Sequence, residues 1–224
     1  MRPYFERDGV TIYCGDAREI LPSITLDRGV LLTDPVYGID GGRGGDARAF
    51  KKGRYAASFE DTEEYVRTVC VPIVDALIQR TIRGAVTPGT RCLSFYPRPA
   101  DIGCFWTPAA ATHGPWGMVT FNPILFYGKD YRAGKGAWPT GRQVTEAAVR
   151  NGHPCPKPER AWRWLAAKVA EPGDVLIDPF LGSGTTTRVA LDLGLQAIGI
   201  EIEERYAEIA ARRLDQLVLP LEAS

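Results

Sequence analysis

The chain has 224 residues, 45% of them hydrophobic and 24% charged, and its 27 lysines and arginines balance 27 aspartates and glutamates. These values are ordinary for a globular protein, and a net charge of zero gives no argument for a nucleic-acid partner. Five cysteines without a C-x-x-C pair and two histidines predict no disulfide framework and no metal site, which fits a reducing cytoplasm. A charged N-terminal segment and the lack of a long apolar run predict no signal peptide and no membrane span.

In chain order, the first expected elements are two short strands at residues 10–13 and 29–33, the second of which is apolar throughout and therefore buried. Residues 39–60 are rich in glycine and in basic side chains, and we expect a mobile basic loop there. We treat residues 1–224 as one domain of ordinary size.

A helix is expected over residues 63–83. Asp61 and Thr62 can cap its start, and one apolar stripe runs along it: Val66, Cys70, Ile73, Val74, Leu77 and Ile78. Residues 92–96 and 119–127 predict two further strands, and Pro123 favours an edge position or a bulge in the second.

The last third of the chain alternates between the two kinds of element. Residues 158–170, 182–193 and 203–217 have helical periodicity, and residues 175–177 and 196–200 are short apolar strand candidates. Strands that alternate with helices at this spacing form a parallel sheet with crossover helices. We therefore predict a Rossmann-like, doubly wound α/β fold.

One strand-to-helix turn has the character of a nucleotide site. The strand at 175–177 runs into Asp178, a turn with Gly182 and Gly184, and a helix whose first N–H groups are free. The next strand ends on Glu201, where folds of this kind bind ribose hydroxyls. The turn lacks the lysine of a phosphate-binding loop, which favours a nucleoside without a polyphosphate, such as S-adenosylmethionine. An ordinary turn before a helix is the alternative interpretation.

A second strand ends in an unusual group of side chains. In LLTDPVYG the apolar run stops at Asp34, Pro35 and Tyr37, which present a carboxylate, a rigid turn and a flat ring at one place. A strand-ending turn with a buried tyrosine would explain the same residues without any chemistry.

Taken together, these motifs resemble the amino-group DNA methyltransferases, which methylate adenine N6 or cytosine N4. Asp34-Pro35-Val36-Tyr37 is similar to their D-P-P-Y motif, residues 178–185 match D-P-F-x-G-S-G-T, and residues 153–158 match H-P-x-x-K-P. Gly15-Asp16 matches an early G-D element. The catalytic motif precedes the cofactor motif, as in the β class. The resemblance implies the class I methyltransferase fold with a circularly permuted motif order.

The resemblance also implies roles for individual residues. Asp34 and the carbonyl of Pro35 would accept the amine hydrogens of an extruded base, and Tyr37 would stack on that base. S-adenosyl-L-methionine would be held by Asp16, Ala17, Asp34, His153, Lys157, Pro158, Asp178, Phe180, Gly182, Ser183, Gly184, Thr185 and Glu201. Two of these roles have a simple structural alternative. Asp16 could be an acid in an ordinary turn, and Lys157 could be a solvated lysine at the start of a helix.

Double-stranded DNA is the partner that the resemblance implies, and basic clusters are the candidates to bind it. These candidates are Arg43, Arg48, Lys51, Lys52, Arg54, Arg132, Lys135, Trp138 and Arg142. Residues 98–152 are the only segment long enough for a target-recognition region. Adenine N6 is preferred, because an aspartate at the head of the motif is more usual for adenine. Members of the family often dimerise, and short chains of this kind resemble phage-borne or restriction-modification enzymes.

Several alternatives remain open. N4-cytosine methylation and methylation of RNA or of a protein amide use related motifs. Val36 replaces the usual second proline, so a catalytically impaired subunit that binds cofactor and DNA is another alternative. Cys155 follows a proline, as does the nucleophile of cytosine-C5 methyltransferases, but it precedes the cofactor motif, which disfavours that class.

Overall fold

The protein is organised around one large sheet. The computed structural model describes residues 2–39, 61–107, 113–114, 116–133, 138–148 and 151–215. The strands of the sheet are β1 Phe5–Arg7, β2 Val10–Cys14, β3 Gly29–Thr33, β4 Arg83–Val86, β5 Asp101–Trp106, β8 Phe121–Gly128, β9 Gly141–Gln143, β10 Val175–Asp178 and β11 Gln196–Glu201. Two shorter strands, β6 His113–Gly114 and β7 Gly117–Met118, pair with each other apart from it.

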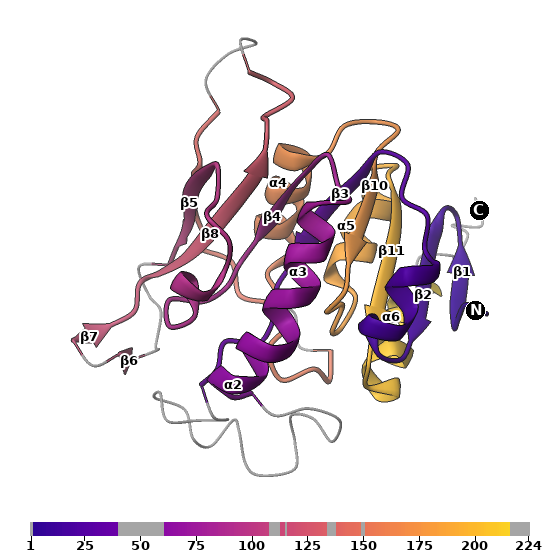
Figure 1. Cartoon of the computed structure of the whole chain (residues 1–224), viewed down its shortest axis with the longest axis horizontal. Coiled ribbons are helices and arrows are strands. Elements are labelled where there is room, and N and C mark those ends of the chain that lie inside the picture. The colour runs from indigo at the N-terminus through magenta and orange to yellow at the C-terminus, as the bar shows by residue number, and fades with distance from the viewer. Residues whose placement is uncertain are drawn as a thin grey trace, which may run out of the picture.

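The order of the strands is β1-β2-β11-β10-β3-β4-β8-β5-β9 (Figure 1). From β2 to β4 every neighbouring pair is parallel. β1 pairs antiparallel with β2 at one side, and β8 pairs antiparallel with both β4 and β5 at the other. This mostly parallel sheet confirms the predicted doubly wound α/β fold.

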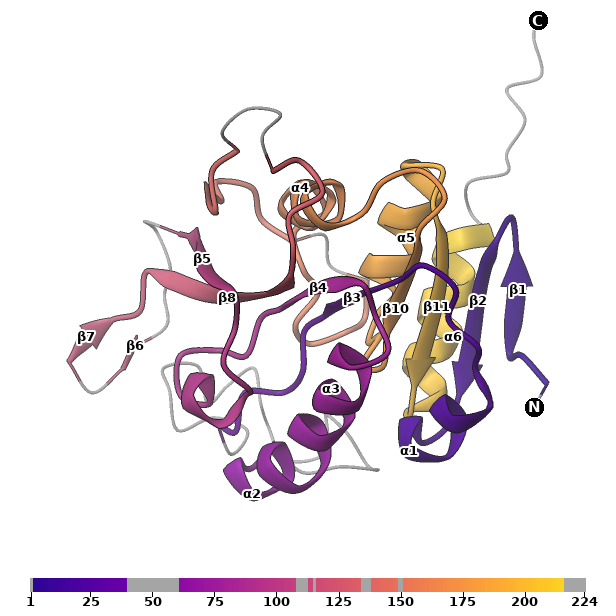
Figure 2. The same ribbon diagram turned by 45° about the horizontal axis from the view of Figure 1, so that its top comes forward.

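Helices cover both faces of the sheet (Figure 2). They are α1 Ala17–Ile20, α2 Glu63–Tyr65, α3 Val71–Ile78, α4 Glu159–Val169, α5 Thr185–Asp192 and α6 Glu204–Asp215. In β3, Val30 and Leu32 pack in the core with α4, α5 and α6, whereas Leu31 packs in the core with α1 and α3. Successive side chains of a strand point to opposite faces, so a strand between two helix layers must be apolar throughout.

The predicted helix over 63–83 is interrupted and ends early. A π-helical segment, Val66–Cys70, lies between α2 and α3, and Pro72 follows at the start of α3. A proline has no N–H for the usual helical bond, and the widened turn before it accommodates that loss. The predicted apolar stripe is nevertheless correct for Val66, Cys70 and Leu77, which are fully buried.

One predicted strand in this half of the chain was wrong, and β4 was not predicted. Arg83 begins β4, which the sequence pattern did not indicate, and residues 92–96 contain a 3-10 helix, Leu93–Phe95, in place of a strand. β4 lies so close to β3 that a Cβ at Gly84 would be 2.7 Å from Leu31 Cβ, so only glycine fits. The apolar character of residues 92–96 reflects burial of Cys92 and Tyr96 without strand pairing.

Pro123 does not mark the sheet edge that its type predicts. It lies in β8, between β4 and β5, and pairs with Cys104 of β5. The ladder between β4 and β8 ends at the pair Val86 and Leu125, so Pro123 lies beyond the end of β4. The missing N–H therefore interrupts no ladder bond on that side.

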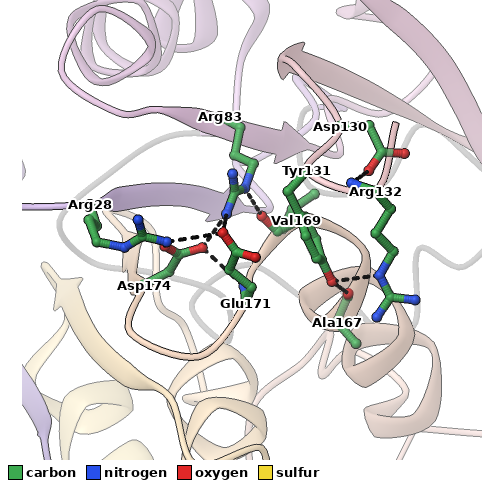
Figure 3. A network of polar contacts seen from close by, with 9 residues as sticks. All are labelled: Arg28, Arg83, Asp130, Tyr131, Arg132, Ala167, Val169, Glu171 and Asp174. Carbon is green, nitrogen blue, oxygen red and sulfur yellow. Dashed lines mark hydrogen bonds and ion pairs between the residues drawn. The ribbon is translucent and has the colours of Figure 1, made fainter. Parts of the chain in front are cut away.

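A polar network closes the sheet at the amino ends of its parallel strands (Figure 3). Asp174 precedes β10 and has no exposed side-chain surface. It pairs with Arg28 before β3, at 2.6 Å, and with Arg83 at the start of β4. Glu171 also contacts both arginines. The network therefore joins three neighbouring strands at the edge opposite to the ends at Thr33, Asp178 and Glu201.

Within the part of the chain that the structure describes, no helix has the length and apolar character needed to span a membrane.

Candidate active site

The carboxyl ends of β2, β3, β10 and β11 surround one open pocket. Its space is about 1110 Å³, including the part open to solvent, and Asp16, Asp34, Asp178 and Glu201 are among the residues that line it. Each of these acids stands at or just after the end of its strand. Because the four strands are parallel neighbours, their carboxyl ends lie at the same edge of the sheet, where ligands of such folds bind.

The segment after β3 is held in place mainly through its backbone. Gly38 has a φ of 66°, and its N–H donates to Asp61 Oδ1 at 2.6 Å. The carbonyl of Tyr37 accepts from the Cys92 thiol at 3.1 Å. These backbone contacts hold the turn that follows Val36, where the second proline of the motif is absent.

Asp34 is the centre of a dense group of hydrogen bonds. Its Oδ1 accepts from the Tyr37 hydroxyl at 2.7 Å and from Thr87 Oγ1. Its Oδ2 lies 2.6 Å from Lys157 Nζ. The Tyr37 hydroxyl in turn accepts from Lys157 Nζ at 3.1 Å and from Asn122 Nδ2 at 3.2 Å. The carboxylate is thus oriented by the nearby Tyr37 and by donors from two distant parts of the chain, Thr87 and Lys157.

Lys157 lines the pocket and forms an ion pair with Asp34. Burial alone would lower the pKa of Lys157, but the Asp34 carboxylate and the Tyr37 hydroxyl raise this pKa well above its ordinary value, so the ammonium form is retained. The Nζ also lies 4.9 Å from the centroid of the Tyr37 ring. A solvated lysine at a helix start is therefore excluded, and the ion pair positions the carboxylate.

Asp178 connects the two motifs directly. Its Oδ1 accepts from Thr33 Oγ1 at 2.6 Å and from the N–H of Phe180 at 3.1 Å, and its Oδ2 accepts from Thr186 Oγ1. Burial raises the pKa of Asp178 to about 6, although these hydrogen bonds favour the carboxylate. Thr33 and Asp178 are 145 residues apart in sequence, so this buried bond brings the end of β3 to the glycine turn.

Glu201 fastens the glycine turn to the end of β11. Its Oε2 accepts from the N–H of Gly182 at 2.7 Å, and its Oε1 accepts from the N–H of Glu203 at 2.9 Å. Burial raises the pKa of Glu201 to about 7 despite these bonds. Carboxylate oxygens have spare lone pairs, so Glu201 can also accept from hydroxyl groups of a ligand.

Gly184 is required for packing rather than for the pocket lining. Its φ is 80°, and a Cβ there would lie 2.6 Å from Ala210 Cβ and 2.9 Å from Ala210 Cα. We expect Gly184→Ala to lower the free energy of unfolding by about 2–5 kcal/mol, the sum of backbone strain and overpacking. Gly194→Ala is the matched control, because Gly194 has a φ of 66° and no atom within 4 Å of such a Cβ.

The control should lose only about 1–2 kcal/mol, the cost of the left-handed backbone. Urea unfolding of both variants measures the difference. Equal losses would contradict the packing role of Gly184.

Two further predicted residues have defined partners in the pocket. His153 packs edge-on against Tyr206, with ring centroids 4.4 Å apart, and burial together with Lys157 lowers the pKa of His153 to about 4. The imidazole is therefore neutral near pH 7. Asp16 caps α1 and accepts from Arg18, whose hydrogen bonds lower the pKa of Asp16. Near neutral pH the pocket therefore contains a neutral His153 imidazole and an ionised Asp16 carboxylate.

The structure brings nearly all of the predicted cofactor residues together. Of that set, only Gly184 and Pro158 do not line the pocket, and Pro158 lies on a neighbouring one. Sequence reasoning missed several lining residues, which come from α2, from the π-helical segment, from the turn after β11 and from α6: Tyr65, Val69, Cys70, Ile202 and Tyr206. One local feature could have indicated Tyr206: in the stretch EIEERY this aromatic residue follows Glu201, the acid at the end of β11, by five positions.

Three of the predicted DNA-binding residues, Arg132, Trp138 and Arg142, lie in the described part of the chain, and none of these three lines the pocket. Arg43, Arg48, Lys51, Lys52, Arg54 and Lys135 lie outside the described residues. Arg132 stacks on Trp138 at 3.8 Å from the ring centroid. Its neighbour Tyr131 packs against Arg83 and hydrogen-bonds to the carbonyl of Ala167, at the amino edge of the sheet (Figure 3). The structure therefore places Arg132 and Trp138 opposite to Asp34.

Arg142 belongs to β9 at the outer end of the sheet, where its Nε is buried and has no hydrogen-bond partner among the described residues. It does not line the pocket either. DNA binding by this set of residues stays a prediction.

Comparison with known proteins agrees with this geometry. Residues 120–212 match a family model described as DNA methylase, covering N6 and N4 methyltransferases. A stretch of 63 residues is 44% identical to the DNA adenine methyltransferase YhdJ of Escherichia coli K12; it covers 28% of this chain and 21% of YhdJ. The matched segment thus spans about a fifth of the length of that relative.

Two solved structures share the fold over almost the whole chain. The M1.HpyAVI-SAM complex has a TM-score of 0.61 at 18% identity and covers 92% of this chain and 99% of its own. The cytosine-N4-specific PvuII DNA methyltransferase has a TM-score of 0.68 at 15% identity and covers 100% of this chain and 91% of its own. With the motif residues assembled around one pocket and the family model matched over residues 120–212, the chain is similar to the amino-group DNA methyltransferases.

Proposed function

We propose that the protein transfers a methyl group from S-adenosyl-L-methionine to an exocyclic amine of a base in DNA, with adenine N6 as the preferred acceptor. One observation carries the proposal: the Asp34 carboxylate and the glycine turn at Gly182 line the same pocket. The matched family and the name of the relative YhdJ support DNA and adenine, and the M1.HpyAVI-SAM complex supports the cofactor.

The pocket lining fits such a cofactor. Gly182 leaves the turn free of a side chain, Phe180 offers an apolar surface, and the carboxylates of Asp16 and Glu201 can accept from hydroxyl or amine groups. The first N–H groups of α5 point out of the helix start near Thr185 and favour a ligand carboxylate. When bound, the cofactor supplies a methyl group on a sulfonium, an electrophile that needs no activation by the protein.

The role of Asp34 is to make the amine nucleophilic. An exocyclic amine on a base is weakly nucleophilic because its lone pair is delocalised into the ring. Asp34 accepts one of its N–H hydrogens, and the Pro35 carbonyl accepts the other, so that electron density returns to nitrogen. The cofactor would supply the methyl carbon to this nitrogen and leave as the neutral thioether, and the methylated amine would release one proton to water. Positioning supplies much of the rate in a transfer of this kind.

The base reaches this site only if it leaves the DNA stack, because a duplex hides the amine. Tyr37 lies close to Asp34 and to the backbone of Gly89, where a Cβ would be 2.7 Å from its ring. Stacking of a base on an aromatic ring contributes about 1–3 kcal/mol. We assign this stacking to Tyr37.

Methyl-tritiated S-adenosylmethionine tests the proposal. The protein is incubated separately with unmethylated DNA, with RNA and with a protein mixture, and the labelled DNA is digested to nucleosides. We expect label in DNA alone, recovered as N6-methyldeoxyadenosine. Label in RNA or in protein would assign the chain another substrate. Cofactor binding without any transfer would favour the impaired subunit.

Cofactor affinity should depend on pH through Glu201. Burial raises the pKa of Glu201 to about 7, and hydroxyl donors bind its carboxylate form. Below that pKa the group is protonated, so affinity should rise by up to about tenfold between about pH 6 and pH 8. Calorimetric titration measures this slope. Glu201→Gln should bind more weakly and lose the slope, and an unchanged slope in this variant would contradict the role of Glu201.

A further inference from the structure

Exposed apolar side chains gather at one end of the sheet. Seven large hydrophobic side chains are exposed in the part of the chain that the structure describes, and five of them come from one stretch: Ile102, Trp106, Trp116, Met118 and Phe121. Residues 102–128 contain no aspartate, glutamate, lysine or arginine. A gathering of exposed apolar side chains without charges indicates a surface that contacts another molecule.

Four of these side chains belong to a two-stranded ribbon. β5 and β8 pair antiparallel as far as Trp106 and Phe121, and β6 and β7 pair antiparallel beyond them. Met118 ends β7, and Trp116 lies in the turn between β6 and β7 with its side chain fully exposed. Figures 1 and 2 both show β6 and β7 standing out from the body of the protein. We call Trp106, Trp116, Met118 and Phe121 the apolar ribbon.

The apolar ribbon begins beside the turn after β3. Asn122, the neighbour of Phe121 in β8, donates from Nδ2 to the Tyr37 hydroxyl at 3.2 Å. β5 runs in the same direction as β4, because both pair antiparallel with β8, so Trp106 lies at the carboxyl edge of the sheet. The pocket with Asp34 lies at the same edge. A DNA segment with one base at Asp34 would therefore pass close to the apolar ribbon.

The shape of the apolar ribbon suits a groove of DNA. The major groove of B-DNA is about 12 Å wide and 8.5 Å deep and admits a two-stranded β-ribbon. Extended chain advances about 3.3 Å per residue, so the stretch from Phe121 to Trp116 can span up to about 17 Å. This reach is longer than the depth of the groove. No carboxylate of residues 102–128 would repel the phosphates on either side.

The chemistry of the apolar ribbon suits the space that an extruded base leaves. That space lies between the flat faces of the two neighbouring bases, where an uncharged ring stacks well and a charged group would lose its hydration. Proteins that separate stacked bases commonly insert uncharged side chains such as phenylalanine and methionine. Trp116 combines a large flat ring with a position at the tip of the apolar ribbon.

We propose that the apolar ribbon inserts into double-stranded DNA beside the extruded base and that the Trp116 ring occupies the gap which this base leaves. This inference rests on the proposed function. The ring stacks on the bases next to the gap and hinders the return of the extruded base, so the base spends more time at Asp34. Trp116 touches none of the reacting atoms and is a positioning residue.

A duplex with a permanent gap tests this placement without turnover. Two fluorescein-labelled duplexes, one intact and one with a single abasic site at its centre, are titrated with protein and S-adenosylhomocysteine, and fluorescence anisotropy gives both affinities. Wild type should prefer the abasic duplex. Trp116→Ala should bind that duplex about fivefold or more weakly, the factor that corresponds to about 1 kcal/mol of stacking, and should lose most of the preference.

Two further variants make the binding result specific. Trp116→Phe keeps an aromatic ring and should retain most of the preference for the abasic duplex. Ile82→Ala is the control for an exposed apolar side chain, because Ile82 is 46% exposed and directly precedes β4 at the opposite edge of the sheet. It should leave both affinities unchanged. Equal binding of the two duplexes by wild type, or an unchanged preference in Trp116→Ala, would overturn the role of Trp116.

Methyl transfer to unmethylated double-stranded DNA separates this inference from the proposed function. We expect Trp116→Ala to lower kcat/KM by about fivefold or more, because less of the base is extruded, and we expect Trp116→Phe to restore most of it. If wild type methylates no DNA, the proposed function fails. If wild type methylates DNA and Trp116→Ala does so at the same rate, the function stands and the placement of Trp116 fails.

A second copy of the chain is the other occupant that an exposed apolar surface could have. Sedimentation velocity compares wild type with Trp116→Ala in the absence of DNA. We expect the same sedimentation coefficient for both proteins, because the proposed partner of the apolar ribbon is DNA. A wild-type dimer that Trp116→Ala dissociates would assign the apolar ribbon to self-association and overturn the proposal.

Discussion

Replacing Asp34 with alanine is expected to lower the rate of methyl transfer by about a thousandfold, the effect of removing a group that stabilises charge in a transition state. The variant should still bind S-adenosylmethionine, because the glycine turn, Phe180 and Glu201 remain in place. Single-turnover transfer of a labelled methyl group measures the transfer rate, and calorimetric titration measures the affinity for S-adenosylmethionine.

The variant also leaves Lys157 without its main partner, which would perturb the pocket by itself. The double variant Asp34→Ala with Lys157→Met removes both charges and should be as inactive as the single one. Asp215→Ala is the control for a surface carboxylate, because its side chain is 61% exposed and its partner is Arg7. Near wild-type transfer by either Asp34 variant would remove this residue from the mechanism.

Replacing Asp174 with alanine is expected to lower the free energy of unfolding by about 3–5 kcal/mol, the usual cost of breaking a buried ion pair. Asp174 has no exposed side-chain surface and pairs with Arg28 and Arg83, and its Oδ2 also accepts from the N–H of Glu171 at 3.0 Å (Figure 3). Its loss leaves Arg83, only 11% exposed, without its closest partner. Urea unfolding followed by circular dichroism measures the change.

Asp215→Ala is also the control for the effect of Asp174→Ala on stability. Asp215→Ala removes an exposed ion pair and should change the free energy of unfolding by about 0–1 kcal/mol. The network lies at the edge of the sheet opposite to the pocket, so cofactor affinity of folded Asp174→Ala should match wild type. A loss below 1 kcal/mol would show that the network does not hold the strands together.

The elements near the cofactor pocket could be predicted well because their signals are local. The strand before Asp178, the glycine turn and the strand before Glu201 each show their type within a few residues, through apolar runs, glycine and a terminal acid. Parallel strands joined by helices place their carboxyl ends at one edge, so the shared pocket followed from the order of elements. The resemblance to a known family added the identity of the chemistry.

Elements whose type depends on remote packing could not be predicted. β4 contains a glycine and only four residues, Arg83–Val86, and it is a strand because Gly84 fits against Leu31 of β3. Residues 92–96 have the composition of a strand, but they bury Cys92 and Tyr96 in the core with α3 without strand pairing. The sequence also could not indicate that Arg132 lies over the ring of Trp138, 3.8 Å from its centroid.

Periodicity and turn chemistry act over a few neighbouring residues, so a doubly wound sheet with an acidic turn after one strand and a glycine turn after another could be predicted from the sequence. The pairing of Lys157 with Asp34 and the bond between Asp178 and Thr33 became visible in the folded structure. Those contacts join residues far apart in the chain, and they depend on which faces meet when the strands and helices pack.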